Sequence, residues 1–392
     1  MQILTTIQRS NAVKRVQDVS LRGPLHAPAP GMVSLAIGEP SFDTPLVIRD
    51  AMVRALASGA THYCDQLGLV PLREAIAKDE SRSETGARAF SVDEILITHG
   101  GSAGLAAVIL GVVNPGDTVA IEDPTYSLYA DLVAFAGGVV TTFRHTPDGD
   151  LDRDSVHAAV RRAKLVIVCQ PSNPTGSILS RSDWTFLEEA TRERQSLIVS
   201  DEAYASLIYD GHEFTSILDV ATLDGRGILC QTFSKKFAMT GWRVGYLVGP
   251  REVIAAASRV HRTFNGSLNT AVQYAAMAAI TEAQSDAARM FTQYAERRSE
   301  METALSSVAG LTARSPAGAF YFFCNYADSR SSVELAHAAS VAGVLVRPGR
   351  EFGAAGEGHV RLSFAVPMED IWEGIRRLSS VLETPANSLA RE

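Results

Sequence analysis

Short runs of aliphatic and β-branched residues alternate with helix-like segments between about residues 92 and 232. SVDEILITHGGSAGLAAVILGVV contains a strand-like run, a glycine turn and a helix-like segment in that order. DTVAIEDPTYSLYADLVAFAGG repeats this order, and KLVIVCQPSNPTG, SLIVSDEAY and GILCQTFSKK supply three further strand ends. The alternation predicts an α/β fold with a mostly parallel sheet covered by helices on both faces. Polar residues follow the strands, and ligands bind at this edge of such sheets.

The pattern changes after about residue 285. A long helix-like segment comes first, and strand-like runs follow in GAFYFF, GVLVRP and HVRLSFA. For a chain of 392 residues, two domains are expected. We expect residues 46–284 to form a large cofactor-binding domain, and residues 31–45 together with 285–392 to form a smaller α+β domain. Residues 1–30 are expected to form an N-terminal arm.

Composition excludes several classes of function. The net charge of −8 disfavours nonspecific binding to nucleic acid, and no apolar run is long enough to span a membrane. The N-terminus has no export signal. The four cysteines lie far apart without a CxxC pair, which predicts neither a metal site nor a disulfide framework. A cytoplasmic location is therefore expected.

Two lysines, Lys235 and Lys236, stand side by side in a chain with few lysines. Only five of its 36 basic residues are lysine, and the rest are arginine. An arginine stays protonated in proteins, whereas a lysine amine can lose its proton and attack a carbonyl carbon. The pair therefore indicates a nucleophilic lysine. A solvated pair on a surface turn is the alternative.

Several groups near the strand ends could bind a phosphate. The segment from Gly100 to Gly104 opens a helix, where free backbone N–H groups and the helix dipole favour an anion. Thr232 and Ser234 offer hydroxyl groups, and Arg243 offers a fork of donors. Taken alone, the glycine segment is equally typical of a tight strand-to-helix turn.

Other groups suit an electron-poor aromatic ring. Asp201 ends a strand, where a buried carboxylate needs a cation such as a pyridinium nitrogen. Asn173 and Tyr204 can donate hydrogen bonds to a phenolate oxygen, and Tyr126 can stack on a ring. Each residue also has an ordinary structural interpretation as a helix cap, a turn residue or a core aromatic. Their joint occurrence favours a binding site for a phosphorylated aromatic aldehyde.

Seven segments resemble the pyridoxal-phosphate-dependent aminotransferases of fold type I, class I/II. They are LAIGEPSFDTP, PSNPTG, SDEAYASLIYDG, TFSKKFAMTGWRVGY, PAGAFYFF, PGREFG and GHVRLSFA. The likeness runs from about residue 33 to 380, and SK-x-x-AMTGWR-x-GY is its most specific element. It implies an aspartate-aminotransferase-like fold with a seven-stranded sheet, and pyridoxal 5'-phosphate as the cofactor. The implied reaction moves an amino group between an L-amino acid and a 2-oxo acid.

The resemblance also implies a role for individual residues. Lys235, rather than Lys236, forms the Schiff base with the cofactor. The implied catalytic residues are Lys235, Asp201 and Tyr204. The implied cofactor-binding residues are Tyr63, Gly101, Ser102, Ala103, Tyr126, Asn173, Asp201, Tyr204, Thr232, Ser234, Lys235 and Arg243. The implied substrate-binding residues are Gly38, Asn173 and Arg361.

Two of these assignments concern the substrate and the assembly. Arg361 resembles the arginine that binds the α-carboxylate of the substrate, and a bidentate pair of this kind is strong and orienting. Tyr63 resembles the tyrosine that reaches the cofactor phosphate of a partner subunit. The resemblance therefore implies a homodimer.

Other reactions on the same apparatus stay open. A lyase, a cyclase or an oxidase would keep Lys235, Asp201 and Arg361, because one fold supports several chemistries. A ligand-sensing regulator is not expected, since only about 30 residues precede the matching region.

The side-chain preference is less constrained. Some aspartate-preferring relatives have a lysine where this chain has Ser102, so we favour neutral or aromatic amino acids. Phe320, Tyr321 and Phe322 could line such a pocket, or they could form a half-buried strand. His261 and Arg262 could offer charge to an acidic substrate at a neighbouring subunit's site. A solvated helix end is the alternative for this pair.

Overall fold

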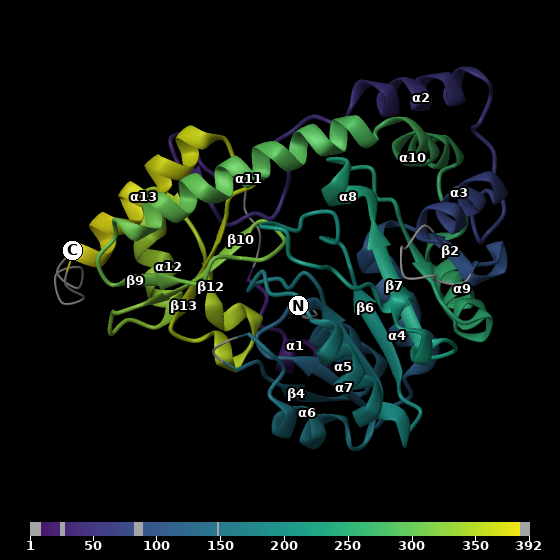
Figure 1. Ribbon diagram of the computed structural model, residues 1–392, viewed down its shortest axis with the longest axis horizontal. Coiled ribbons are helices and arrows are strands. Elements are labelled where there is room, and N and C mark those ends of the chain that lie inside the picture. The colour runs from purple at the N-terminus through teal and green to yellow at the C-terminus, as the bar shows by residue number, and fades with distance from the viewer. Residues whose placement is uncertain (1–8, 24–27, 82–88, 147–148, 385–392) are drawn as a thin grey trace, which may run out of the picture.

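A seven-stranded sheet forms the centre of the larger lobe (Figure 1). The computed structural model describes residues 9–23, 28–81, 89–146 and 149–384. The strand order is β2-β8-β7-β6-β5-β3-β4, and β8 runs antiparallel to both neighbours while the other pairs are parallel. This confirms the expected sheet. Its strands are β2 (Ile95–Thr98), β3 (Thr118–Glu122), β4 (Val139–Phe143), β5 (Ala163–Cys169), β6 (Leu197–Asp201), β7 (Gly227–Thr232) and β8 (Gly245–Val248).

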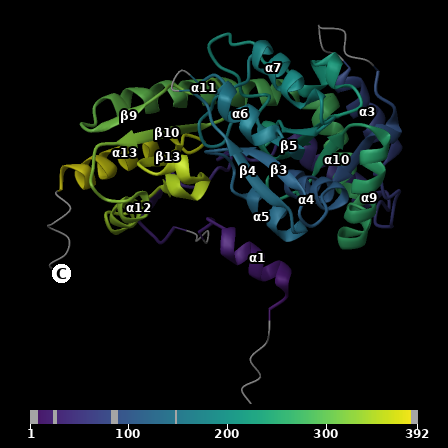
Figure 2. The ribbon, with the colours of Figure 1, turned by 90° about the horizontal axis from the view of Figure 1, so that it is seen from below.

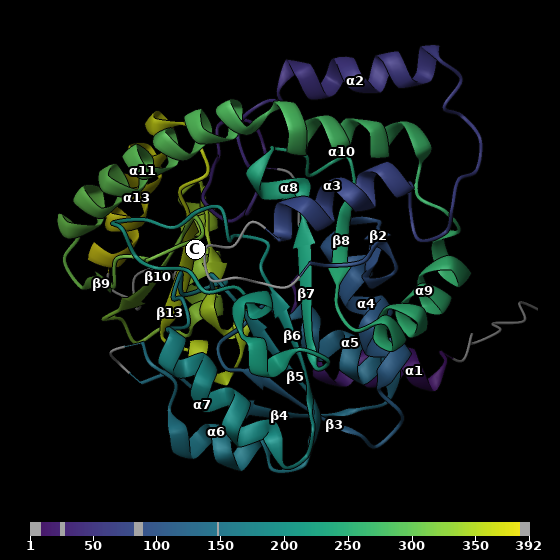
Figure 3. The ribbon, with the colours of Figure 1, turned by 45° about the vertical axis from the view of Figure 1, so that its right-hand side comes forward.

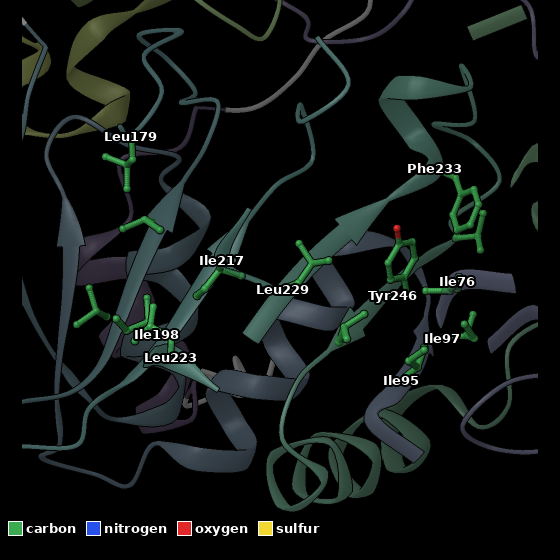
Figure 4. Packing of buried hydrophobic residues seen from close by; sticks show 14 of the residues in the cluster. Ile76, Ile95, Ile97, Leu179, Ile198, Ile217, Leu223, Leu229, Phe233 and Tyr246 are labelled. Carbon is green, nitrogen blue, oxygen red and sulfur yellow. The ribbon is translucent and has the colours of Figure 1, made fainter. Parts of the chain in front are cut away.

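The strand residues alternate between two hydrophobic cores, one on each face of the sheet. On β5, Val166 and Val168 enter one core, while Leu165 and Ile167 enter the other, as the two-residue period of a strand requires. The first core, part of which is drawn in Figure 4, is covered by α2 (Leu46–Ala57), α3 (Val70–Glu80), α6 (Arg153–Val160), α7 (Arg181–Arg192) and α10 (Thr270–Glu282). The second is covered by α4 (Gly100–Val112), α5 (Leu128–Ala136) and α9 (Arg251–Asn265).

The smaller lobe contains an antiparallel sheet of order β12-β13-β10-β9. Its strands are β9 (Leu311–Ala313), β10 (Tyr321–Tyr326), β12 (Arg347–Pro348) and β13 (His359–Ser363). Its helices are α12 (Ser332–Val341), α13 (Met368–Glu383) and the long α11 (Gln284–Ser306), which extends from the side of α10 toward α13 (Figure 3). Near the N-terminus, β1 (Val33–Ser34) pairs with β11 (Val344–Leu345), so both ends of the chain build this lobe.

Short 3-10 helices join these elements. They are η1 (Val92–Glu94), η2 (Ile217–Asp219), η3 (Ala221–Leu223), η4 (Gly349–Phe352) and η5 (Ala354–Gly356). One further helix of four residues, α8 (Phe233–Lys236), follows β7 directly and carries the lysine pair. Within the described ranges, no helix is both long and apolar enough to cross a bilayer.

The expected N-terminal arm contains a helix that the sequence patterns do not predict. This helix, α1 (Asn11–Val19), begins after Ser10, whose hydroxyl accepts a hydrogen bond from the N–H of Val13. No residue of α1 is buried, and the helix lies on the outside of the molecule against α5 (Figure 2). Arg15 fixes it there by donating to the Ala134 carbonyl oxygen at 2.9 Å. Residues 1–8 and 24–27 of the arm lie outside the described residues.

Candidate active site

The predicted site residues gather where β5, β6 and β7 end and where the smaller lobe faces them. Asn173 follows β5, Asp201 ends β6, and Thr232 ends β7. Arg361 on β13 reaches Asn173 from the smaller lobe, and its Nη1 donates to Asn173 Oδ1 at 2.8 Å. The site therefore lies between the carboxyl edge of the large sheet and the smaller lobe.

Lys235 points into this site. Its Nζ donates to the Gly38 carbonyl oxygen at 2.6 Å and lies 5.9 Å from the centroid of the Tyr204 ring. Burial lowers the pKa of the Lys235 amine to about 8, and the nearby Arg361 guanidinium lowers it in the same direction. A lysine in this state has a neutral fraction near neutral pH, which attack on a carbonyl requires.

Lys236 points elsewhere. Its Nζ lies 5.2 Å from the centroid of the Phe237 ring. It lines a surface cavity of about 250 Å³ together with Leu207 and residues of α11. The neighbouring positions of the pair thus have different environments, and only Lys235 is near the other predicted site residues.

The N-terminus of α4 is arranged for an anion. Gly100 has a φ of +76°, and the first turn of α4 has no acidic residue. A Cβ atom built on Gly100 would lie 2.8 Å from Nη2 of Arg243, so this guanidinium is packed against the helix start. Arg243 has a φ of +54°, a conformation that costs on the order of 1 kcal/mol or more for a residue other than glycine. A cation beside a helix N-terminus is repelled by the dipole, so this arrangement favours a bound anion.

Hydroxyl groups surround the same helix start. Thr232 Oγ1 donates to Ser234 Oγ at 2.8 Å, and the Ser234 N–H donates back to Thr232 Oγ1 at 3.2 Å. Ser102 is in the first turn of α4, next to Gly101 and Ala103. These donors, with Arg243, are the groups that a phosphate monoester binds.

Asp201 is a buried carboxylate whose partners are incomplete. Its Oδ2 accepts from the Tyr129 hydroxyl at 2.8 Å, and its Oδ1 accepts from the Ala203 N–H at 3.3 Å. Burial raises the pKa of the Asp201 carboxyl. A cationic hydrogen-bond donor would restore the charged form, and a protonated pyridine nitrogen is such a donor.

The sequence patterns did not identify Tyr129. It lies three residues after Tyr126 and is fully buried in α5. The two tyrosine rings are 5.6 Å apart in an edge-to-face arrangement. Tyr126 precedes α5 and Tyr129 lies in its first turn, so the available signal was the position of both tyrosines just after β3, at the edge of the sheet where ligands bind.

Arg361 is positioned by both lobes. Besides Asn173, it donates through Nη2 to the Ala36 carbonyl oxygen at 2.6 Å, and its guanidinium carbon lies 4.1 Å from the centroid of the Tyr321 ring. Among the described residues, its buried Nε has no hydrogen-bond partner. An unpartnered buried donor carries a free-energy penalty, which an incoming carboxylate would remove.

Tyr321 contacts several of the predicted residues. Its hydroxyl is 2.8 Å from that of Tyr204, and a Cβ atom on Gly38 would lie 1.8 Å from it, so only glycine fits there without displacement. Phe320 is also close, with its ring centroid 5.6 Å from Nζ of Lys235. Phe322 instead packs against Phe364 in the core of the smaller lobe, so it does not line the site.

Tyr63 stands apart from the other predicted residues. It lies in the loop after α2, and 97% of its surface is exposed. Nothing within the described part of the chain brings it to the site of its own subunit.

The suggested role of His261 is wrong. Its ring is buried, and Nε2 accepts from the backbone N–H of His99 at 3.2 Å, immediately before α4. Burial, reinforced by the His99 charge, lowers the pKa of His261 to about 4. The ring is therefore neutral at neutral pH and cannot offer charge to an acidic substrate. It is not a solvated helix end either, although the adjacent Arg262 is exposed.

These groups together fit pyridoxal 5'-phosphate. The donors at the start of α4 suit its phosphate, and the buried carboxylate of Asp201 suits its ring nitrogen. The amine of Lys235 suits its aldehyde. A bound cofactor phosphate would account for the strained backbone of Arg243. A bound substrate carboxylate would account for the unpartnered Nε of Arg361 among the described residues.

Known proteins of similar sequence and structure agree with this fit. The chain matches the family "Aminotransferase class I and II" over residues 30–378. It is 36% identical over 362 residues to the aspartate/prephenate aminotransferase of Thermus thermophilus, covering 90% of this chain and 91% of that one. It is 36% identical over 365 residues to aromatic-amino-acid aminotransferase 2 of Thermococcus litoralis, covering 90% and 92%. The structure of an aromatic aminotransferase from Pyrococcus horikoshii OT3 has a TM-score of 0.86 to this fold, at 32% identity, covering 95% and 98%.

The fold and the site thus define a pyridoxal-phosphate enzyme with the aspartate-aminotransferase-like architecture. The chain belongs to the class I and II aminotransferases. It is a transferase that uses pyridoxal 5'-phosphate to move an amino group between an amino acid and a 2-oxo acid.

Proposed function

We propose that Lys235 carries the cofactor and transfers the proton at the substrate Cα. The position and the pKa of its amine carry the proposal: Nζ lies 2.6 Å from the Gly38 oxygen, and the pKa is lowered to about 8. General acid–base catalysis is most effective when the pKa of the catalytic group lies near the working pH. An ordinary lysine, with a pKa near 10.4, would be almost entirely protonated.

We propose that Arg361 binds the α-carboxylate of the substrate. Asn173 and Tyr321 hold the guanidinium in one orientation, and its Nε remains to be satisfied. A fixed guanidinium forms a bidentate pair that orients the Cα–H bond toward Lys235. The bound cofactor supplies an electron sink, and Asp201 stabilises its ring nitrogen in the protonated form.

The other assignments follow from the same placement. Asn173 and Tyr204 would bind the phenolate oxygen of the cofactor, and Tyr126 would stack on its ring. Gly38 would close over the substrate carboxylate through its backbone. The proposed phosphate-binding residues are Gly101, Ser102, Ala103, Thr232, Ser234 and Arg243.

The proposed domain boundaries place these two functions on different parts of the chain. Residues 46–284 would bind the cofactor, and residues 31–45 with 285–392 would carry the substrate-binding Gly38 and Arg361. The pairing of β1 with β11 supports this division, because it attaches the segment before Gly38 to the C-terminal lobe.

We propose a homodimer in which Tyr63 reaches the cofactor phosphate of the partner. The almost complete exposure of this side chain supports a role outside its own subunit. The neighbouring α2 exposes the apolar residues Leu46, Val53 and Leu56. Exposed apolar residues gathered on one element are typical of a protein–protein interface.

A cytoplasmic location is also proposed. All four cysteines are free thiols, and three of them are buried. Free thiols persist in a reducing compartment.

The proposed amino donors have neutral or aromatic side chains. Ser102 supplies no charge for an acidic side chain, and the Tyr321 ring faces the α-carboxylate site. Relatives named for aromatic amino acids and for aspartate and prephenate set the range of substrates to test.

The test is a panel of single amino acids added without any oxo acid to the enzyme loaded with pyridoxal phosphate. Absorbance follows the cofactor, and 2-oxo acid and ammonia are assayed. We expect one equivalent of oxo acid per site, conversion of the cofactor to its amine form, and the fastest conversion with neutral or aromatic amino acids. Ammonia or product accumulating over many turnovers would instead identify a lyase, a cyclase or an oxidase. Fastest conversion with aspartate or glutamate would contradict the substrate preference.

A further inference from the structure

A second arginine lies beside the proposed α-carboxylate site. Arg347 on β12 is the direct cross-strand partner of Arg361 on β13. Directly opposite residues of an antiparallel pair place their side chains on the same face, where two like charges repel each other. The Arg361 charge is close enough to lower the pKa of the Arg347 guanidinium, after the larger effect of burial. The site thus holds two neighbouring cations, of which the α-carboxylate needs only one.

Glu351 on η4 partly neutralises this second arginine. Its Oε2 lies 2.8 Å from Nη2 of Arg347, and only 13% and 16% of the two side chains are exposed. However, within the described part of the chain this buried oxygen makes no hydrogen bond of good geometry, so charge rather than a bidentate fit holds the pair together. The other oxygen, Oε1, accepts from the Gly23 N–H at 3.2 Å. Glu351 therefore has a second partner to hold it if Arg347 moves away.

The N-terminal arm brings a third guanidinium to the same place. The guanidinium carbon of Arg22 lies 5.6 Å from the centroid of the Tyr126 ring. Its positive charge is felt by the side chains of Arg347 and Glu351, and also by that of Asp131 on α5. Arg22 is exposed, so it faces solvent at the edge of the site. Arg347 is the better shielded of the two and is therefore the stronger candidate for binding a second carboxylate.

We propose that Arg347 determines substrate specificity by binding the side-chain carboxylate of a dicarboxylic substrate, exchanging Glu351 for that carboxylate, with Arg22 lining the same subsite. This inference rests on the proposed function of Arg361. A substrate with a neutral or aromatic side chain leaves the Arg347–Glu351 pair intact, so the same pocket stays electrically balanced. The two half-reactions of transamination could then use an uncharged amino donor and a dicarboxylic oxo acid in one pocket.

The test compares two unreactive acids of equal chain length on the enzyme loaded with pyridoxal phosphate. Glutarate has two carboxylates and valerate has one, and the dissociation constant of each is read from the change in cofactor absorbance. We expect Arg347→Gln to weaken glutarate binding at least tenfold and to change valerate binding less than twofold. Glu351→Gln should tighten glutarate binding severalfold, because Arg347 loses its competing partner. Arg350→Gln is the matched control, since this exposed arginine is three residues away from Arg347, and neither constant should change.

Two results would overturn the proposal. One is an equal loss of glutarate and valerate binding in Arg347→Gln, which would indicate a structural role. The other is weaker glutarate binding in Glu351→Gln, which would exclude the exchange. The half-reaction with a neutral amino acid tests the proposed function independently of the two dissociation constants. Failure of that half-reaction in the unaltered enzyme would refute transamination of such donors and leave the comparison of the two acids interpretable.

Discussion

At the scale of single residues, burial decides which lysine of the adjacent pair can react. The charged form of Lys235 is destabilised by burial and by Arg361, whereas Lys236 lies over Phe237 beside a surface cavity. Covalent attachment of the cofactor needs a neutral amine. Its rate should therefore depend on the pKa of Lys235.

We predict that the rate of covalent cofactor uptake by the apoenzyme rises about tenfold per pH unit below pH 8 and levels off above it. The folded pKa is below the ordinary value for lysine, so the neutral fraction saturates near pH 8 rather than above pH 10. Stopped-flow absorbance measures the rate. Lys236→Ala should keep this profile, and Lys235→Ala should lose the covalent phase. Uptake of the amine form of the cofactor, which forms no covalent bond to lysine, should lack the covalent phase and its dependence on pH. A profile still rising at pH 10 would contradict the lowered pKa.

The proposed role of Asp201 depends on its negative charge and on the Tyr129 hydroxyl that is hydrogen-bonded to it. Replacing it with Asn removes the charge that stabilises a protonated ring nitrogen. Hydrogen bonds to charged groups contribute about 1.5–3 kcal/mol, so we predict a loss of about 10- to 100-fold or more in turnover, with the cofactor still bound. Tyr129→Phe removes the 2.8 Å hydrogen bond to the same carboxylate and should give a smaller loss, because Asp201 keeps its charge.

Two measurements separate these effects. Steady-state kinetics gives turnover, and the pH titration of the cofactor absorbance reports the ionisation of the bound cofactor. Tyr129→Phe should shift this titration without releasing the cofactor. Full turnover of Asp201→Asn would show that another group holds the ring nitrogen.

At the scale of elements, the close approach of β8 to the start of α4 fixes the anion-binding turn. A Cβ atom on Gly245 would lie 2.7 Å from the Gln231 carbonyl oxygen and 3.0 Å from the backbone of Gly100 and Gly101. These are backbone atoms of secondary structure, so they cannot move aside as a flexible side chain can. A side chain at this position would therefore displace the helix N-terminus.

We predict that Gly245→Ala weakens cofactor binding to the apoenzyme by at least about tenfold, since even one displaced hydrogen bond to a charged group is worth on the order of 1.5 kcal/mol or more. Equilibrium titration with the amine form of the cofactor measures this loss without the covalent step. Gly241→Ala is the control, because a Cβ atom there would meet no heavy atom within 4 Å. Equal affinities for the two variants would mean that the turn adapts without loss.

The elements also explain how much could be predicted from the sequence. The alternation of strands and helices predicted the sheet and its functional edge, because Asp201 and Thr232 end strands that are buried on both faces. The helix α1 was not predicted, although Val13, Val16 and Val19 recur at helical spacing, because nine residues that are all left unburied are a short and weak signal. The register that sets Arg347 against Arg361 joins residues 14 apart, and strand register depends on tertiary packing rather than local pattern.

Some side chains were misread for the same reason. His261 resembles a polar helix end in the sequence, but the packing of α9 against α4 buries it next to His99. Tyr129 was not identified, because its role depends on its hydroxyl reaching Asp201 from another element. Burial of a side chain is decided by which helix packs on which face, and that information is not local in the sequence.

At the scale of the whole molecule, the exposure of Tyr63 leads to a prediction about assembly. If Tyr63 completes the site of a partner subunit, a chain that lacks Lys235 can still supply an intact Tyr63 to another chain. We predict that Lys235→Ala and Tyr63→Ala chains, each of low activity alone, form mixed dimers that regain activity when unfolded together and refolded. In such a dimer, one site combines the intact Lys235 of one chain with the intact Tyr63 of the other. With random assembly half of the dimers are mixed and each has one intact site, so about a quarter of the wild-type activity should return.

The complementing result depends on Tyr63 acting across the subunit boundary. If it acted within its own subunit, every site containing Lys235 would also contain the Tyr63 substitution, and mixing would restore nothing. A mixture of Lys235→Ala with Asp201→Asn chains is the matched control. Both of these residues belong to one site within a chain, with Lys235 on α8 and Asp201 at the end of β6. In a mixed dimer of these two variants, one site lacks Lys235 and the other lacks Asp201. No site is intact, so mixing should restore no activity. Sedimentation of the wild-type protein as a monomer at assay concentrations would contradict the prediction before any mixing is done.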